Sequence, residues 1–216
     1  MSERDAGLVA RTTSPEETRD LAAALAELAR PSDLLVLVGD LGAGKTAFTQ
    51  GFGRGLGIDE QITSPTFALV RSYTGRLDLY HLDVYRLEQV VEAMDLGLSE
   101  LLDDGSVTVI EWGDTIAPAL PHDYLEVHLR FEEPDGAHAD ASDGRGPEWT
   151  SPSYDCRRVE LRPIGPRWSA RVRALGAAVA PWEVGRATGG DDGPSDSTDS
   201  TDSADRHDSE DGSAGC

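Results

Sequence analysis

Residues 36–46 read VLVGDLGAGKT, and this stretch decides the fold. A GxxxxGKT pattern over 39–46 follows directly on the apolar run Leu34–Val38, which is typical of a strand covered on both faces. The glycines let the backbone bend so that successive N–H groups point at phosphate oxygens, and a helix expected over 45–56 adds its positive N-terminal end. The stretch therefore predicts a phosphate-binding loop between a strand and a helix.

Lys45 is the only lysine among the 19 basic residues of the chain, and the others are arginines. A guanidinium is broader and planar, so it does not fit the space that an ammonium occupies beneath such a loop. We therefore expect Lys45 to reach the β- and γ-phosphates of a nucleotide, and the Thr46 hydroxyl to bind Mg²⁺. The residues expected to contact the nucleotide are Asp40, Leu41, Gly42, Ala43, Gly44, Lys45 and Thr46.

Elsewhere, helix and strand signals alternate along the chain. Ser14 and Glu17 have the spacing of a capping box and Pro15 takes the first helical position, so a helix is expected from there to Pro31. The other expected elements are a hairpin of 67–73 and 77–85, a short helix at 88–94, a buried strand at 107–110, strands around 125–131 and 159–161, and a helix with Trp168, Val172, Leu175 and Val179 on one side. This mixture predicts an α/β fold, a P-loop NTPase with a central, mostly parallel sheet, antiparallel edge strands and flanking helices.

Two segments are too acidic and too poor in apolar residues to join a core. Residues 132–153 (EEPDGAHADASDGRGPEWTSPS) are expected to form an acidic loop inserted between two strands, and residues 186–216 a disordered acidic tail. Neither segment can bury enough apolar surface to offset the entropy lost on ordering. We therefore expect one P-loop ATPase domain over 1–185, with the insert inside it and the tail outside it.

Charge and composition narrow the classes of partner. The formal net charge of -21 argues against a protein that grips nucleic acid by its own surface. No apolar run approaches the roughly 20 residues of a membrane span, and the N-terminus lacks the apolar stretch of a signal peptide. Cys156 and Cys216 lie in no metal-ligand spacing, and we expect no structural disulfide. These observations predict a cytoplasmic protein without membrane contact.

A phosphate-binding loop does not by itself say what is done with the nucleotide. Guanine-specific GTPases usually read their base with an Asn-Lys-x-Asp motif, and this chain has no asparagine and no second lysine. A small-molecule kinase needs an acceptor pocket and usually an arginine-bearing lid, whereas the long loop here is acidic. The kinase stays open as an alternative, as does a nucleotide-gated binding module with negligible hydrolysis.

Three further stretches accompany the loop: TSPTF at 63–67, YHLDVYRL at 80–87 and IEW at 110–112. In this order and spacing they resemble the TsaE family, small bacterial ATPases required for threonylcarbamoyladenosine (t6A) synthesis in tRNA. The resemblance runs from about Thr12 to Leu175, and the two acidic segments depart from the compact family pattern. It implies ATP as substrate and Mg²⁺ as cofactor.

The resemblance also implies roles that the expected elements support. Glu111 ends a buried strand and matches a magnesium ligand of the family, so Thr46 and Glu111 form the expected metal site. Asp83 is expected to orient water or metal, whereas His81 on the same strand face is expected to be a packed, hydrogen-bonded histidine. The catalytic candidates are Lys45, Asp83 and Glu111.

The remaining candidates are implied by the resemblance. Thr63, Ser64 and Thr66 resemble the loop that senses the γ-phosphate in the family, as a GTPase switch does. Apart from the resemblance, Trp112 is expected to pack near the nucleotide or a partner surface, with core filling as the alternative. For the base, which no motif marks, the resemblance suggests Thr12 and Arg158.

The resemblance finally implies a cytoplasmic Mg²⁺-dependent ATPase that acts with TsaD- and TsaB-like proteins. In the family, TsaD transfers threonylcarbamoyl to the adenosine beside the anticodon, and this chain would hydrolyse ATP to reset the complex between turnovers. Its contact with tRNA would be indirect, which agrees with its acidic charge.

Overall fold

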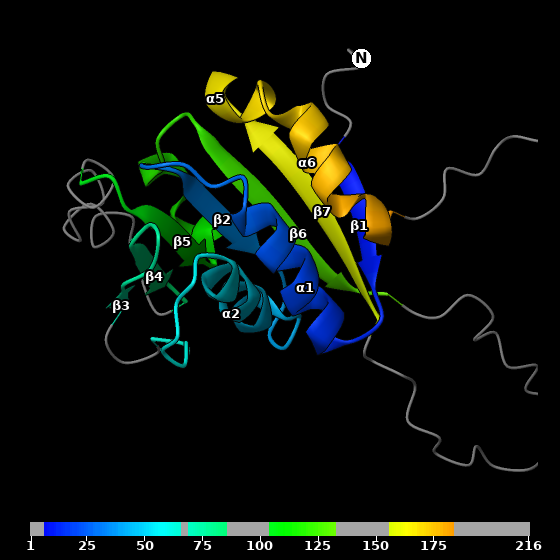
Figure 1. Cartoon of the computed structure of the whole chain (residues 1–216), viewed down its shortest axis with the longest axis horizontal. Coiled ribbons are helices and arrows are strands. Elements are labelled where there is room, and N and C mark those ends of the chain that lie inside the picture. Colours follow the sequence, from blue (N-terminus) through cyan, green and yellow to red (C-terminus); the bar gives the residue numbers. More distant parts are fainter. Residues whose placement is uncertain (1–6, 66–68, 86–103, 133–155, 184–216) are drawn as a thin grey trace, which may run out of the picture. The chain divides into compact units, whose positions relative to one another are not determined.

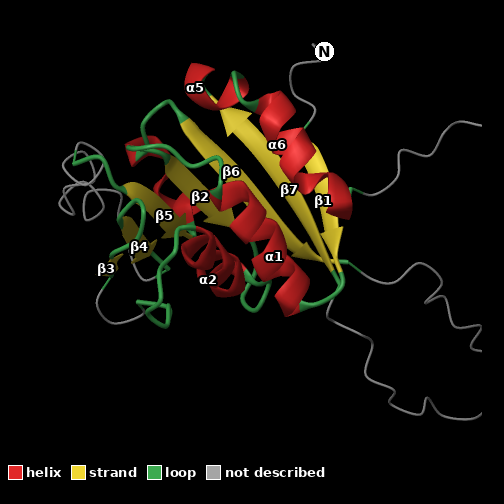
Figure 2. Ribbon diagram, viewed as in Figure 1, coloured by secondary structure: helices red, strands yellow, loops and turns green. Residues whose placement is uncertain are grey.

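The computed structural model describes residues 7–65, 69–85, 104–132 and 156–183. In this part of the chain, one seven-stranded sheet has the order β1-β7-β6-β2-β5-β4-β3 (Figures 1 and 2). The strands are β1 (Leu8–Thr12), β2 (Leu34–Val38), β3 (Val70–Tyr73), β4 (Leu79–Asp83), β5 (Val107–Glu111), β6 (Tyr124–Phe131) and β7 (Arg157–Ile164). The helices are α1 (Pro15–Ala26), α2 (Lys45–Gly55), α5 (Pro166–Ser169), α6 (Val172–Val179) and the 3-10 turns η2 (Gly113–Ala119) and η3 (Ala180–Trp182).

The middle of the sheet is parallel and its edges are antiparallel. Strand β2 runs parallel to both β5 and β6, and β4 runs parallel to β5. Antiparallel strands extend the sheet at both ends, with β7 and β1 beyond β6 and the hairpin strand β3 beyond β4. The predicted fold class is therefore confirmed, including the hairpin and the two strands that follow the parallel centre.

Strand β2 is apolar throughout because both of its faces are covered. Leu35 and Leu37 belong to the larger core cluster, which lies under helices α1, α2 and α6. Leu34 and Val36 belong to a smaller cluster on the opposite face. Figure 1 shows α1, α2 and α6 lying across the same face of the sheet. Since β2 is central and buried on both sides, the loop that follows it starts from a rigid base.

The start of α1 forms the predicted cap at Ser14, but the Glu17 side chain bonds to the N–H of Thr13 instead of the N–H of Ser14. The Ser14 hydroxyl accepts from the Glu17 N–H at 3.1 Å, and Pro15 occupies the first turn. The Glu17 carboxylate accepts from the backbone N–H of Thr13 at 2.6 Å, one residue before the helix cap. These two bonds satisfy the N–H groups of Glu17 and Thr13 at the start of α1.

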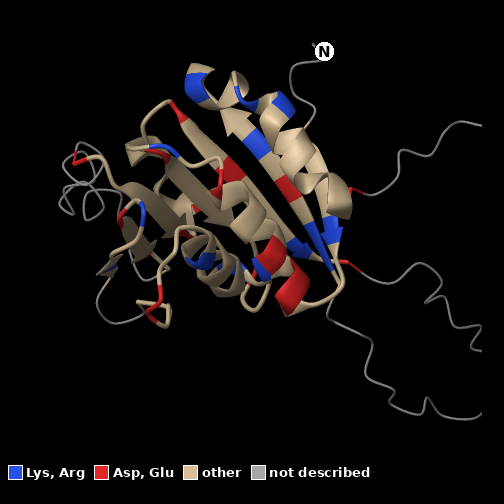
Figure 3. Ribbon diagram, viewed as in Figure 1, with Lys and Arg blue, Asp and Glu red and all other residues tan. Residues whose placement is uncertain are grey.

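Charged residues of both signs are interspersed over the described ribbon (Figure 3). One row is of a single sign: Arg11, Arg158 and Arg130 lie directly opposite one another across β1, β7 and β6. Arg11 pairs with Glu132 at 2.9 Å. Arg158 is exposed, so this row lies on the sheet face that α1 and α6 leave uncovered.

Gly51 of α2 lies in close contact with the backbone of α1, and it supports a stability prediction. A Cβ built there would lie 2.1 Å from the Arg19 carbonyl oxygen, so the helices would have to move apart. We expect Gly51→Ala to lower the free energy of unfolding by about 1–3 kcal/mol. Gly176 of α6 is the control, because its Cβ would meet only Leu8 Cδ2, at 3.7 Å. Gly176→Ala should be neutral or stabilise by up to about 1 kcal/mol. Urea unfolding midpoints of the two variants test this, and equal midpoints would contradict the close helix contact.

Two sequence expectations need correction. Strand β1 was not predicted, because LVART is short and lies at the sheet edge. The single C-terminal helix is two helices, α5 and α6, separated at Arg171, whose guanidinium makes two bonds of 2.6 and 2.7 Å to Asp33. Val172 is 40% exposed, because the interruption shifts it off the buried side that holds Trp168 and Leu175.

Several expected segments lie outside the described residues. They are the short helix at 88–94, all of the acidic insert except Glu132, the tail at 186–216 and Thr66. The division of the chain into a domain over 1–185 and a tail stays a prediction.

Candidate functional site

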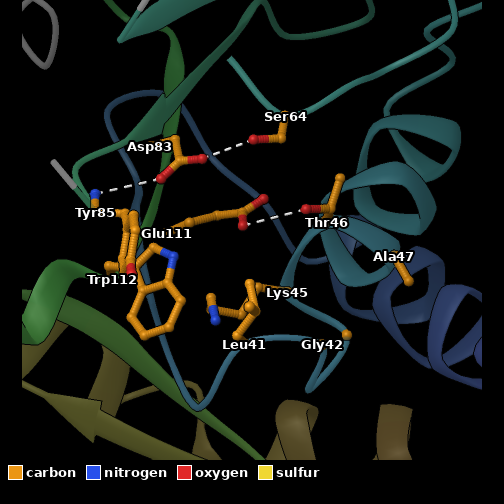
Figure 4. A pocket seen from close by; sticks show the side chains of 11 residues that line it. Leu41, Gly42, Lys45, Thr46, Ala47, Ser64, Asp83, Tyr85, Glu111 and Trp112 are labelled. Atoms are coloured by element: carbon orange, nitrogen blue, oxygen red, sulfur yellow. Dashed lines mark hydrogen bonds between the residues drawn. The ribbon is translucent and has the colours of Figure 1, made fainter. Parts of the chain in front are cut away.

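A pocket of about 390 Å³ opens where β2, β4 and β5 end and α2 begins. Parallel strands of α/β sheets commonly present ligand sites at their carboxyl ends. Figure 4 shows side chains from the loop, α2, β4 and β5 converging on this pocket. The lining residues are Leu41, Gly42, Gly44, Lys45, Thr46, Ala47, Ser64, Asp83, Tyr85, Glu111 and Trp112.

The loop 39–44 wraps one side of the pocket, and two of its glycines are required by geometry. Gly39 has φ +151, and a Cβ there would lie 2.2 Å from the Leu129 carbonyl oxygen on β6. Gly44 caps α2 in the left-handed region with φ +107. Side chains are therefore excluded at both ends of the loop, and its backbone can come close to a ligand.

Lys45, the first residue of α2, is buried beneath this loop, with 4% of its surface exposed. Its ammonium donates to the carbonyls of Gly39 at 2.7 Å and Asp40 at 2.9 Å, and it lies 3.4 Å from the centre of the Trp112 ring. Burial lowers the pKa of this ammonium below its ordinary value, while the negative charge of Glu111 opposes the shift. The Lys45 ammonium therefore lies beneath the loop, between two backbone carbonyls and the face of the Trp112 ring.

Thr46 and Glu111 face each other across the pocket. The Thr46 hydroxyl donates to Glu111 Oε2 at 3.2 Å, and Glu111 Oε1 lies 2.9 Å from His81 Nε2 (Figure 4 shows the first of these bonds). Glu111 is the last residue of β5 and is 3% exposed. The parallel pairing of β2 with β5 brings this carboxylate to the first turn of α2.

Asp83 completes the acidic side of the pocket. It ends β4, and its Cα partner across the parallel pair is Glu111. Its Oδ2 accepts from the Ser64 hydroxyl at 2.6 Å, and its Oδ1 accepts from the Tyr85 N–H at 3.3 Å. The carboxylates of Asp83 and Glu111 are thereby held at the carboxyl ends of two neighbouring strands. Asp83 lies beside the loop at 63–65, and Glu111 lies beside α2.

Trp112 forms a wall of the pocket in an unusual backbone conformation. Its φ and ψ are 64 and 28, a left-handed conformation that is uncommon for a bulky residue. Its N–H donates to the Leu37 carbonyl at 2.9 Å, which ties it to β2. Its ring lies 4.9 Å from the Tyr85 ring and against the Lys45 ammonium. The conformation turns the indole toward the loop directly after Glu111.

The oxygen donors in this pocket fit Mg²⁺. Mg²⁺ prefers oxygen ligands and commonly takes one or two protein oxygens together with phosphate oxygens and water. Thr46 Oγ1 and Glu111 Oε2, already 3.2 Å apart, are such a pair. Within the described residues, no group of three or more His, Cys, Asp or Glu side chains could hold a metal ion by itself.

Some sequence candidates do not reach the pocket lining. Thr12 is buried in β1 and its hydroxyl bonds to that of Thr18 at 2.8 Å. The hydroxyl of Thr63 accepts from Arg71 at 2.8 Å. Arg158 points away from the loop, because the neighbouring Arg157 takes the inward position on β7. A nucleotide contact by Thr12 or Arg158 stays a prediction.

Arg157 is a residue near the site that the sequence reading missed. Its Nε donates to the Ala43 carbonyl at 3.0 Å, and its guanidinium carbon lies 4.4 Å from the centre of the Phe131 ring. The signal was present, since Val159 and Leu161 point inward and strand alternation places Arg157 on the same face. Arg157 therefore holds the back of the loop in place.

A strand, a glycine-rich loop closed over a lysine, a following helix and an acid ending the neighbouring parallel strand define an α/β protein of the P-loop class. The family model described as "Threonylcarbamoyl adenosine biosynthesis protein TsaE" matches residues 12–139. The chain belongs to the TsaE family.

Similar proteins agree with this placement. The chain is 47% identical over 121 residues to the tRNA threonylcarbamoyladenosine biosynthesis protein TsaE of Bacillus subtilis, covering 56% of this chain and 75% of that protein. It is 38% identical over 155 residues to the protein of the same name from Streptomyces coelicolor, covering 70% of this chain and 93% of that protein. The crystal structure of Bacillus subtilis YdiB superposes with a TM-score of 0.62 at 33% identity, covering 82% of this chain and 98% of that one.

None of the helices in the described segments is long and apolar enough to span a membrane.

Proposed function

We propose that this chain is a cytoplasmic Mg²⁺-dependent ATPase that supports t6A modification of tRNA together with TsaD- and TsaB-like proteins. One observation carries the proposal: Lys45, the Thr46–Glu111 pair and Asp83 converge on one pocket at the mouth of the phosphate-binding loop. Family membership supplies the connection to threonylcarbamoyladenosine biosynthesis. Contact with tRNA is indirect in this proposal, which fits the net charge of -21.

The loop and Lys45 bind the phosphates of ATP. Gly44, Lys45 and Thr46 at the start of α2 line the pocket, and the N–H groups of a helix start favour a bound anion. The Lys45 ammonium exchanges the Gly39 and Asp40 carbonyls for phosphate oxygens. Because Lys45 is almost fully buried, its charge acts in a medium of low polarity and is strongly felt by a bound phosphate.

Thr46 and Glu111 hold Mg²⁺, which would offset the negative charge that develops on the phosphate oxygens. Asp83 orients the attacking water and accepts a hydrogen bond from it, while Ser64 and the Tyr85 N–H keep its carboxylate in place. Ser64 lies in the loop proposed to respond to the γ-phosphate, so its bond to Asp83 connects that loop to the water site.

Hydrolysis by the isolated chain is expected to be slow. No arginine is among the described residues that line the pocket. Arg157 already donates to Ala43 behind the loop, and Arg71 to Thr63. A TsaD- or TsaB-like partner that supplies a cation to the pocket would raise turnover by roughly a thousandfold or more.

Phosphate release from ATP, measured without any phosphoryl acceptor, tests this proposal. We expect slow release by the chain alone and faster release with TsaD- and TsaB-like proteins. A rate for the chain alone that equals the rate of the assembled mixture would contradict dependence on partners. Release only after an acceptor is added would identify a small-molecule kinase instead. Tight ATP binding without turnover in every mixture would identify a nucleotide-gated binding module.

A further inference from the structure

His81 is a fully buried imidazole beneath the candidate metal site. It has 0% exposure, and it lies on β4 two residues before Asp83. Its Nε2 is 2.9 Å from Glu111 Oε1, whereas its Nδ1 is buried without a hydrogen-bond partner. In the function proposed above, Glu111 holds Mg²⁺, and His81 has no assigned role.

The strand register explains how His81 reaches Glu111. In the parallel pair of β4 and β5, Asp83 is the Cα partner of Glu111 and His81 is the Cα partner of Val109. His81 therefore meets Glu111 on the diagonal, a distance that long side chains can span. The layer below it is apolar, formed by Leu79 and Val107. His81 is thus the first polar group between the hydrophobic core and the carboxylates.

A histidine at this place has a cost that an aliphatic residue would avoid. A buried polar atom without a partner destabilises a protein, and Nδ1 is such an atom. The neighbouring core positions Leu79 and Val109 show that apolar side chains fit this face. What an aliphatic side chain cannot supply is the hydrogen bond from Nε2 to Glu111.

We propose that His81 is a positioning residue for Glu111: its Nε2–H donates to Oε1 and keeps Oε2 directed at the Thr46 hydroxyl. The inference rests on the proposed function, in which the Thr46–Glu111 pair holds Mg²⁺. Groups that hydrogen-bond to metal-binding carboxylates fix their orientation, and their loss typically lowers metal affinity or activity by 10–100-fold. Without His81, the Glu111 carboxylate is free to turn toward the Lys45 ammonium. The two groups already interact, because burial lowers the pKa of Lys45 and the negative charge of Glu111 raises it in opposition.

The test measures binding of Mn²⁺ in the presence of ADP, by electron paramagnetic resonance, in the full chain. His81→Leu removes the donor and keeps the bulk, and we expect Mn²⁺ affinity to fall by roughly 10–100-fold. His81→Gln places an amide N–H donor at a similar reach, and we expect most of the affinity to return. ADP affinity in EDTA should stay close to that of the wild-type chain in both variants. If His81→Leu does not fold, His81→Asn, whose amide is too short to reach Glu111, takes its place in the comparison.

A double-mutant comparison separates positioning from a structural role. Glu111→Gln alone should lose the metal contribution, and adding His81→Leu to it should lower Mn²⁺ affinity no further. Wild-type Mn²⁺ affinity in His81→Leu, or a loss that His81→Gln does not restore, would overturn the inference. If Glu111→Gln itself binds Mn²⁺ like the wild-type chain, then the proposed metal site fails and not the role of His81 alone.

Discussion

Lys45→Ala is expected to weaken ATP binding and abolish ATP hydrolysis together. The Lys45 ammonium is a buried cation of the pocket. In the proposed function it would contact phosphate in the ground state and interact more strongly in the transition state, where charge builds on the phosphate oxygens, so both affinity and rate depend on it. We expect turnover to fall by at least roughly a hundredfold, with ATP affinity lowered alongside it. ATP titration by calorimetry and single-turnover hydrolysis measure the two effects.

Lys45→Arg separates charge from shape. The ammonium sits within 2.7–3.4 Å of two carbonyls and the Trp112 ring, and a planar guanidinium is too broad for that space. We expect Lys45→Arg to fail nearly as completely as Lys45→Ala. Arg54→Ala is the control, since it removes an exposed cation that pairs with Glu16 and Asp20 on α1. Normal turnover by Lys45→Arg would show that charge alone suffices and that the pocket is less restrictive than its contacts indicate.

Asp83→Asn is expected to reduce the hydrolysis rate by about a hundredfold or more while ATP affinity stays within a few-fold. The amide keeps the size of the carboxylate. It still accepts from the Tyr85 N–H, and the Ser64 hydroxyl can accept from the amide in place of donating. The structure around residue 83 is therefore preserved, and the change isolates the negative charge that orients water. Single-turnover hydrolysis and ATP titration of this variant measure the two quantities.

Asp104→Asn is the matched control for this substitution. Asp104 is also a hydrogen-bonded carboxylate, accepting from Tyr80 and Ser106, but it lies before the start of β5 and outside the pocket lining. We expect its variant to hydrolyse ATP normally. If Asp83→Asn also turns over ATP at the wild-type rate, Asp83 is a structural strand residue and its assignment to the chemistry is wrong.

The sequence predicted those parts of the fold that local patterns dictate. Leu34–Val38 is apolar at every position because β2 is covered on both faces, and the glycine pattern after it requires a tight loop with helix α2 beyond. The placement of Glu111 was also predictable from a local pattern, because an acid that ends a buried strand lies at the carboxyl end of that strand. Thr46 and Glu111 then meet because β2 and β5 are parallel neighbours.

Features that depend on register between distant segments could not be read from the sequence. Strand alternation indicates that Arg157 points inward, but its contact with Ala43 depends on β7 pairing with β6 next to the loop, and the long acidic insert between those strands hides that pairing. His81 was correctly expected to be packed and hydrogen-bonded, but its partner follows from the pairing of β4 with β5. At the interruption, Arg171 forms an ion pair with Asp33, a residue far away in the chain.

The most direct test of the account is a crystal structure of the chain with ADP and Mn²⁺, read from the anomalous difference map. We expect the β-phosphate within hydrogen-bond distance of Lys45 Nζ and the N–H groups of residues 42–46, with the Mn²⁺ peak beside Thr46 Oγ1 and held by Glu111 directly or through water. A nucleotide bound outside the loop, or a Mn²⁺ peak remote from both Thr46 and Glu111, would contradict it.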